Sequence, residues 1–177
     1  MRSAVWKRFA YATALIGLTT IAVIGKDVRT ISVRDECDPA TFDAAVGPGT
    51  CIGDGDVTFD EFLAEVPNGG HPEWRFNSDR TEADVAVNAN NRGGEAHTFT
   101  KVARFGGGFI DLLNNGAAPI PECAVTLPDG SLIPSQKALD TIIPPDGQNH
   151  LTTPLDRGTN RFQCCIHPWM QSTVTRR

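Results

Sequence analysis

The stretch Phe162-Gln163-Cys164-Cys165-Ile166-His167-Pro168-Trp169-Met170, close to the C-terminus, places three metal-binding side chains within seven residues. They are a thiolate, an imidazole and a thioether, with the spacing Cys164-x-x-His167-x-x-Met170. Cysteine and methionine are soft ligands that favour copper, and imidazole suits copper as well. A copper site for electron transfer takes two histidines, one cysteine and a weak axial methionine, so the rest of the chain must supply a second imidazole.

Three other histidines are candidates for that second imidazole: His71, His97 and His150. His97 is favoured because it lies just after a Gly-Gly turn, at the start of a predicted strand. A β-sandwich can bring such a position beside the loop that joins its last two strands. His71 lies in a linker-like Gly-Gly-His-Pro stretch and His150 in a polar turn, where a histidine is more often a solvated surface residue.

The second half of the chain reads as several short strands separated by turn signals. Alternating apolar residues and flanking Gly, Pro and Asn residues predict strands at 74–76, 84–88, 96–102, 141–143, 150–152, 160–164 and 172–175. Strands of this length at regular spacing predict an antiparallel β-sandwich. Residues 105–136 form a long excursion rich in Gly, Pro and Asn, and such loops tend to be functional.

Two short helices are predicted before the β region. Asp38 is a good N-cap with Pro39 at the first helical position. Thr58 and Glu61 form a capping box that opens a second helix, which ends before Pro67. The residues between 37 and 66 therefore predict a small helical hairpin, and residues 26–36 before it read as a linker or a first strand.

The stretch Asp54-Gly-Asp-Val-Thr-Phe-Asp-Glu-Phe62 also resembles the second half of a calcium-binding EF-hand loop. Aligning its Gly and Glu with that loop puts Thr50 and Ile52 at positions that must donate oxygen. Isoleucine cannot donate, and helix capping explains the same residues, so a calcium site is disfavoured.

Five cysteines are present, at positions 37, 51, 123, 164 and 165. An odd count in an oxidising compartment leaves one thiol unpaired. If copper holds one thiolate, four cysteines remain for two disulfides. Cys37 and Cys51 bracket the first predicted helix, and a disulfide there would close a loop of about 15 residues, worth about 3 kcal/mol.

The first 25 residues read as an export signal, because Arg2, Lys7 and Arg8 precede an apolar run from Phe9 to Gly25. No Ala-x-Ala cleavage site is present, so the segment is either a cleaved signal peptide or a membrane anchor. We expect a periplasmic or extracellular protein organised as residues 1–25, a linker and helical hairpin at 26–70, and a copper-binding domain at 71–177.

The charge of the exported part excludes some classes of partner. Removal of residues 1–25 leaves 13 basic residues against 21 acidic ones, a net charge of −8. That charge disfavours nucleic acid as a partner, since phosphates need a cationic surface. It favours solubility and a basic docking partner.

Two stretches together resemble a known family. Asn91-Arg-Gly-Gly-Glu-Ala-His97-Thr-Phe and the stretch 162–170 are similar to those of the cupredoxins, small blue copper proteins of the plastocyanin, azurin and amicyanin type. The resemblance covers about residues 72–177. It implies an all-β fold, a Greek-key β-sandwich with one copper ion, cycling between Cu(I) and Cu(II), at one end. The implied ligands are His97, Cys164, His167 and Met170.

The resemblance also bears on the doubled cysteine. Family spacing and strand alternation both select Cys164 as the ligand and turn Cys165 away from the metal. Cys123 is then the remaining partner for Cys165, either in a disulfide that ties the excursion to the copper loop or as two free thiols. His167, on a loop, is expected to have an exposed edge and to serve as the electron port.

These observations predict an exported blue copper protein that transfers single electrons between unidentified redox partner proteins. We expect a monomer, with membrane contact only through an uncleaved N-terminal segment. Copper storage or delivery is the alternative, since it uses the same ligands. Zinc is disfavoured because it takes four strong ligands. An enzyme is disfavoured because copper oxidases need additional histidine clusters, and two of the four histidines are already used. A purely structural sandwich is the remaining alternative.

Overall fold

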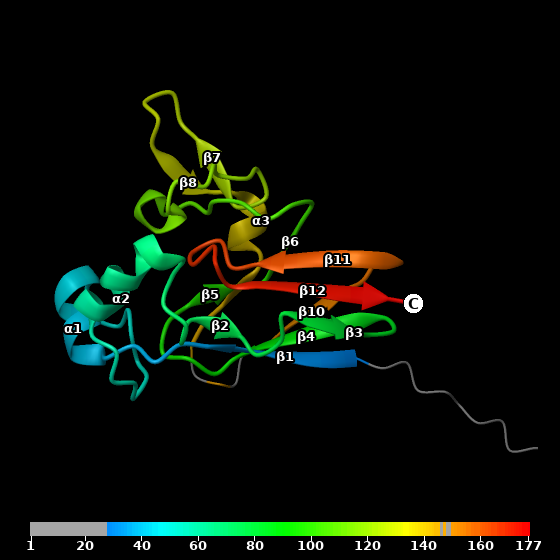
Figure 1. Ribbon diagram of the computed structural model, residues 1–177, viewed down its shortest axis with the longest axis horizontal. Coiled ribbons are helices and arrows are strands. Elements are labelled where there is room, and N and C mark those ends of the chain that lie inside the picture. The colour runs from blue at the N-terminus through cyan, green and yellow to red at the C-terminus, as the bar shows by residue number, and fades with distance from the viewer. Residues whose placement is uncertain (1–27, 146, 148–149) are drawn as a thin grey trace, which may run out of the picture.

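The computed structural model describes residues 28–145, 147 and 150–177 of the chain, which are mostly β with a few short helices (Figure 1). The first four-stranded sheet has the order β10-β4-β1-β2, formed by His150–Pro154, Ala86–Asn91, Val28–Arg34 and Arg75–Phe76. The second has the order β3-β12-β11-β6, formed by Arg80–Glu82, Gln171–Arg176, Gly158–Gln163 and Thr100–Val102. Two small pairs complete the sheets: β5 (His97–Thr98) with β9 (Ile142–Ile143), and β7 (Ala124–Thr126) with β8 (Leu132–Pro134).

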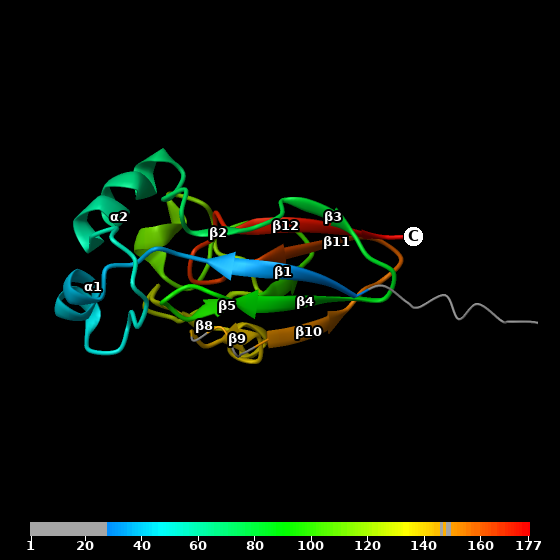
Figure 2. The same ribbon diagram turned by 90° about the horizontal axis from the view of Figure 1, so that it is seen from below.

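The two larger sheets form two layers with the main hydrophobic core between them (Figures 1 and 2). Alternation along β1 turns Ile31 and Val33 inward, and both are buried. The second layer contributes Phe162, whose ring stacks on that of Phe99 with 4.3 Å between centroids. Both rings are fully buried, so this pair lies at the centre of the core.

The prediction of a purely antiparallel arrangement was wrong, because both larger sheets are mixed. β1 pairs with β4 in parallel, with Val28 opposite Ala86, and β12 pairs with β3 in parallel. A parallel pair needs a long connection between its strands. The segment between β1 and β4 is long enough because it holds two helices and two short strands. Strand β3 was not predicted, and the Greek-key connectivity stays a prediction.

The two predicted helices are present as α1 (Pro39–Val46) and α2 (Phe59–Glu65). Asp38 caps α1 by accepting a hydrogen bond from the Thr41 amide, and α2 begins with the predicted capping box. The Cys37–Cys51 disulfide is confirmed. The description of α1 and α2 as a helical hairpin stays a prediction, and so do the domain boundaries.

Both helices lie at the end of the sheets where β11 ends and β12 begins (Figures 1 and 2). Apolar residues explain that position. Phe42 of α1 and Phe62 of α2 are buried, and both rings pack against Trp74, with centroids 5.8 and 4.7 Å away. Burial of aromatic rings of this size dominates the energetics of a small contact, so the helices are fixed to this end.

The predicted strand at 96–102 is interrupted at Phe99. Its first half, β5, pairs with β9 so that His97 lies opposite Ile143, and its second half, β6, joins the second sheet. The break lets the Phe99 ring enter the core, and the His97 side chain next to it is also fully buried.

The excursion at 105–136 forms the lobe at the top of Figure 1 and packs on a small second core that it shares with Val102, Ala138 and Cys165. It contains the 3-10 turn η2 (Asp111–Asn114), the β7–β8 pair, and leads into α3 (Gln136–Leu139); a second 3-10 turn, η1 (Val66–Asn68), follows α2. The Cys123–Cys165 disulfide is confirmed, and both cysteines are fully buried. This disulfide ties the excursion to the residue that follows Cys164.

In the part of the chain that the structure describes, no helix combines the length and apolar character that a membrane crossing needs. The predicted export or anchor segment at 1–25 lies outside the described residues.

The aromatic stack in the core gives a stability prediction. Phe162→Ala should lower the free energy of unfolding of the metal-free protein by about 3–5 kcal/mol, because it leaves a cavity against Phe99. Leu112→Ala is the control: Leu112 is 68% exposed, and its truncation should change stability by less than about 0.5 kcal/mol. Chemical denaturation measures both, and equal losses for the two variants would contradict this core assignment.

Candidate metal centre

The loop between β11 and β12 is closed by its own backbone. The Cys164 amide donates to the Met170 carbonyl at 3.0 Å, and the Met170 amide donates to the His167 carbonyl at 3.0 Å. A short loop with these two hydrogen bonds holds the three predicted ligands on one compact turn.

Three side chains converge at this loop. The Cys164 sulfur lies 3.8 Å from His97 Nδ1 and 3.9 Å from His167 Nδ1, and the two Nδ1 atoms lie 3.3 Å apart. Their donor atoms all lie within 4.8 Å of one another, which makes them a candidate metal group. His97 and Cys164 are fully buried and His167 is 2% exposed, so the group is shielded from water.

Backbone amides surround the Cys164 sulfur. The Thr98 and His167 amides point at it, at 3.4 and 3.5 Å. Burial alone would raise the pKa of the Cys164 thiol. Hydrogen bonds with His167 and His97, and their positive charge, outweigh burial and hold that pKa well below its usual value of 9.0. This environment favours the thiolate form of Cys164 in the metal-free protein.

The far nitrogen of His97 meets a buried carboxylate. His97 Nε2 lies 2.7 Å from Asp35 Oδ2, and both side chains have no exposed surface. Burial alone would lower the pKa of His97, but its hydrogen bonds to Asp35 and Cys164 raise that pKa to about 10 in the metal-free protein. With Nε2 directed at Asp35, the Nδ1 atom faces Cys164 and His167.

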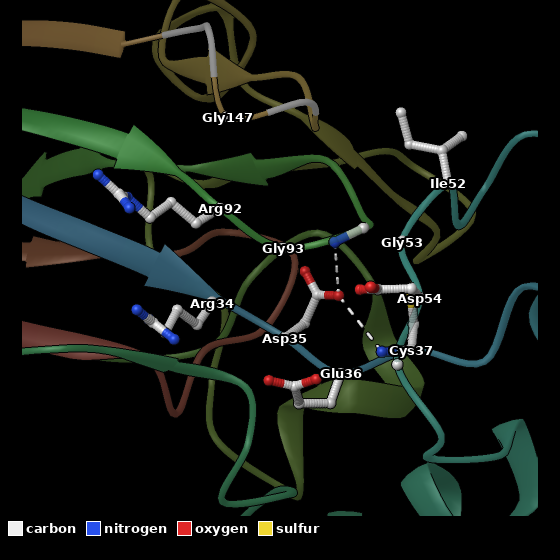
Figure 3. Close-up of a pocket in the computed structure, with 12 residues that line it drawn as sticks. Arg34, Asp35, Glu36, Cys37, Ile52, Gly53, Asp54, Arg92, Gly93 and Gly147 are labelled. Carbon is white, nitrogen blue, oxygen red and sulfur yellow. Dashed lines mark hydrogen bonds between the residues drawn. The ribbon is translucent and has the colours of Figure 1, made fainter.

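The backbone holds Asp35 in place. Its carboxylate accepts hydrogen bonds from the amides of Gly94 at 2.9 Å, Glu95 at 3.2 Å and Cys37 at 3.4 Å. Figure 3 shows this carboxylate at the wall of a cavity of about 530 Å³. Burial alone would raise the pKa of Asp35, but the His97 contact and the amide donors lower it below its usual value.

A second carboxylate faces the other imidazole. Glu95 Oε2 lies 3.7 Å from His167 Nε2 and accepts a hydrogen bond from Trp74 Nε1 at 2.5 Å. Burial raises the pKa of Glu95 despite the nearby His167 and the Trp74 donor. Each candidate imidazole ligand thus has a buried acid near its far nitrogen.

The expectation that His167 has an exposed edge was wrong. Aromatic rings cover it: Trp169, Phe62 and Trp74 lie with centroids 5.5, 5.7 and 6.4 Å from its imidazole. Two of these rings come from outside the cupredoxin-like stretches, in α2 and the segment that follows it. The two stretches that carry the resemblance, 91–99 and 162–170, could not reveal this covering because neither contains Phe62 or Trp74.

The predicted site residues have different outcomes. The structure brings together His97, Cys164 and His167. Met170 is 1% exposed in the same loop, joined to Cys164 and His167 through its backbone. His71 packs against Trp74 instead, with centroids 5.2 Å apart. The assignment of these residues as copper ligands remains a prediction, and for His150 only the backbone, in β10, is described.

Asp35 and Glu95 were not predicted, although the sequence carries a signal for each. Asp35 continues the inward alternation of Ile31 and Val33, so an acid on the buried face of β1 requires a buried partner. Glu95 is two residues before His97, in the stretch that resembles the family, and an acid so close to a candidate ligand is a signal of this kind.

The similarity of the chain to known proteins is low. No family model matches the chain, and no curated protein matches it. Among solved structures, the Cu(I) form of a methionine-to-glutamine mutant of amicyanin is 18% identical, with a TM-score of 0.33, covering 65% of this chain and 89% of that chain. The Cu(I) form of a methionine-to-alanine mutant of amicyanin is 17% identical, with a TM-score of 0.30, covering 58% and 73%. These TM-scores are low, so the function proposed below rests on the residues of the site.

The state of the thiol in the metal-free protein is testable. Because its neighbours lower the pKa of Cys164, the ultraviolet absorption of a thiolate should be present at neutral pH and disappear in acid. Cys164→Ser, which removes the one free cysteine of the described chain, is the control and should lack this absorption. A thiolate signal that develops only near pH 9 would contradict the described environment.

Proposed function

We propose that the chain is an exported type 1 copper protein that binds one copper ion and transfers single electrons between redox partners. The observation that carries the proposal is the convergence of His97, Cys164 and His167 within 4.8 Å in a buried site. A cupredoxin-like Greek-key sandwich, with copper at the end of the sheets, is the fold that we propose with it.

The donor set suits copper better than zinc. One thiolate and two imidazoles are borderline to soft donors, and the nearby Met170 supplies a thioether, a ligand that selects copper. Within the described residues, the candidate group has three strong donors, whereas structural zinc sites take four. A trigonal group with a weak fourth ligand is the arrangement of electron-transfer copper sites.

Each residue then has a distinct role. Bound copper would supply the redox couple, by cycling between Cu(I) and Cu(II). Cys164 would bind copper as a thiolate. His97, whose raised pKa keeps a proton on Nδ1 in the metal-free protein, would have to lose that proton, so copper affinity should rise with pH. Met170 would supply a weak thioether ligand that tunes the reduction potential. Pro168 and Trp169 keep the loop short and exclude water.

The aromatic cover defines the route of the electron. Since His167 is 2% exposed, an electron that enters or leaves through it crosses the layer made by Trp169, Phe62 and Trp74. His167 also borders an apolar cavity of about 350 Å³ between the helices and η2. The port is therefore one layer of side chains below the surface.

Burial of the site favours electron transfer over the alternative of copper storage or delivery. A protein that hands on copper needs a ligand within reach of the acceptor, whereas all three strong donors here are at most 2% exposed. A rigid, dry site exchanges electrons without exchanging its metal.

Export and the redox partners stay proposals. Two disulfides in the described chain support an oxidising compartment, because disulfides persist in secreted and periplasmic proteins. A net charge of −8 after loss of residues 1–25 supports a basic partner surface.

The copper site predicts a colour. The full chain loaded with Cu(II) should show an intense visible thiolate-to-copper band, and Cys164→Ser should abolish it. The control is the double variant Cys123→Ala/Cys165→Ala, which removes the neighbouring disulfide and should keep the band. A colourless copper adduct of the unsubstituted protein would refute the blue copper assignment.

Electron transfer and copper delivery predict different behaviour of the loaded protein. An electron carrier should give a reversible one-electron voltammetric wave and retain Cu(I) against a competing chelator, because the buried ligands hinder exchange. Trp169→Ala opens the cover and should speed loss of Cu(I). Rapid transfer of Cu(I) from the unsubstituted protein to the chelator would support delivery instead.

A further inference from the structure

Two buried carboxylates lie near the far nitrogens of the two imidazoles in the candidate metal centre. The distance from carboxylate to imidazole differs between the two pairs. Asp35 Oδ2 is within hydrogen-bond distance of His97 Nε2, at 2.7 Å. Glu95 Oε2 is farther from His167 Nε2, at 3.7 Å, and its short contact is with Trp74 Nε1. Asp35 is therefore the acid that acts directly on a ligand.

The contact fixes which nitrogen of His97 can bind a metal. The carboxylate accepts a hydrogen bond from the N–H at Nε2, and this directs Nδ1 at the group formed with Cys164 and His167, where loss of its proton would free it to bind a metal. The ring cannot turn over without losing a buried hydrogen bond, which is costly for both partners.

Asp35 itself has little freedom. Besides His97, three backbone amides donate to it, and one of them belongs to Cys37, which is tied to Cys51 by a disulfide. The turn at Gly93 brings two of those amides within reach, and a Cβ atom added to Gly93 would overlap the Asp35 carboxylate. Only glycine allows the turn to approach Asp35 this closely.

The charge of Asp35 is balanced by His97 rather than by a surface cation. In Figure 3, the side chains of Arg34 and Arg92 extend away from the carboxylate, and its ion pair is with His97. A buried anion interacts strongly with a nearby metal because the surrounding dielectric constant is low. It stabilises the higher metal charge more than the lower one.

We propose that Asp35 is a positioning residue for the copper site: it fixes His97 for coordination through Nδ1, and its buried negative charge stabilises Cu(II) relative to Cu(I). The inference rests on the proposed function, since it assigns a role toward the copper of that same site. Asp35 thereby lowers the reduction potential of the centre without touching the metal.

The test compares reduction potentials and visible spectra of the copper-loaded full chain with those of Asp35→Asn and Asp54→Asn. Asparagine keeps the size of Asp35 and one acceptor oxygen, which can still accept from the Gly94 and Cys37 amides, but removes the charge. Asp54 is the matched control, because it lines the same cavity and is exposed to solvent (Figure 3).

Asp35→Asn should stay blue and raise the ratio of Cu(I) to Cu(II) affinity at least tenfold, which is about 59 mV for a one-electron couple. Asp54→Asn should change the ratio less than about twofold, because exposed charges are screened by salt. A blue Asp35→Asn variant with an unchanged potential would overturn the inference. A colourless copper adduct of the unsubstituted chain overturns the proposed function instead, and the inference falls with it.

A second measurement decides the case in which Asp35→Asn fails to fold or to bind copper. In the unsubstituted Cu(I) protein, nuclear magnetic resonance should show a proton on Nε2 of His97 that is strongly deshielded and exchanges slowly with water. Absence of a proton on Nε2, or coordination through that atom, overturns the inference without any substitution.

Discussion

The hydrogen bond from the Thr98 amide to the Cys164 sulfur joins two segments that are 66 residues apart, and the metal centre depends on it. A second contact from the same residue supports it, since the Cys165 amide donates to Thr98 Oγ1 at 2.7 Å. Together they hold β5 against the loop between β11 and β12. This contact places His97 beside Cys164, and the stacked rings of Phe99 and Phe162 continue the same contact into the core.

The helices α1 and α2 change what the β region alone would present. Their aromatic residues and Trp74 close the end of the sheets, so the imidazole of His167 lies under a layer of rings. Burial lowers the dielectric constant around the site and so strengthens the electrostatic interaction with every nearby charge. Asp35 contributes such a charge from the end of β1. Phe62 of α2 thus supplies part of the cover of His167, and Asp35 supplies the acid partner of His97.

Local signals in the sequence predicted much of this structure. Side-chain caps placed both helices correctly because a cap is a contact between residues three positions apart. The position of Cys37 and Cys51 on either side of the first helix indicated one disulfide, and the family resemblance with strand alternation left Cys123 as the partner of Cys165. Sequence reasoning failed where distant segments meet: the parallel pairing of β1 with β4, the burial of His167 and the contact between Asp35 and His97. These depend on how the segment 35–85 crosses the end of the sheets, which no local pattern encodes.

The central claim is that His97, Cys164 and His167 together bind one copper ion. X-ray absorption at the copper edge of the Cu(I)-loaded full chain tests it most directly, because it reports the number and type of atoms bound to the metal. The account predicts one short copper–sulfur contact and two imidazole nitrogens, with at most one further, longer sulfur contact. A copper ion surrounded only by nitrogen and oxygen, or by two equally short sulfur contacts, would contradict it.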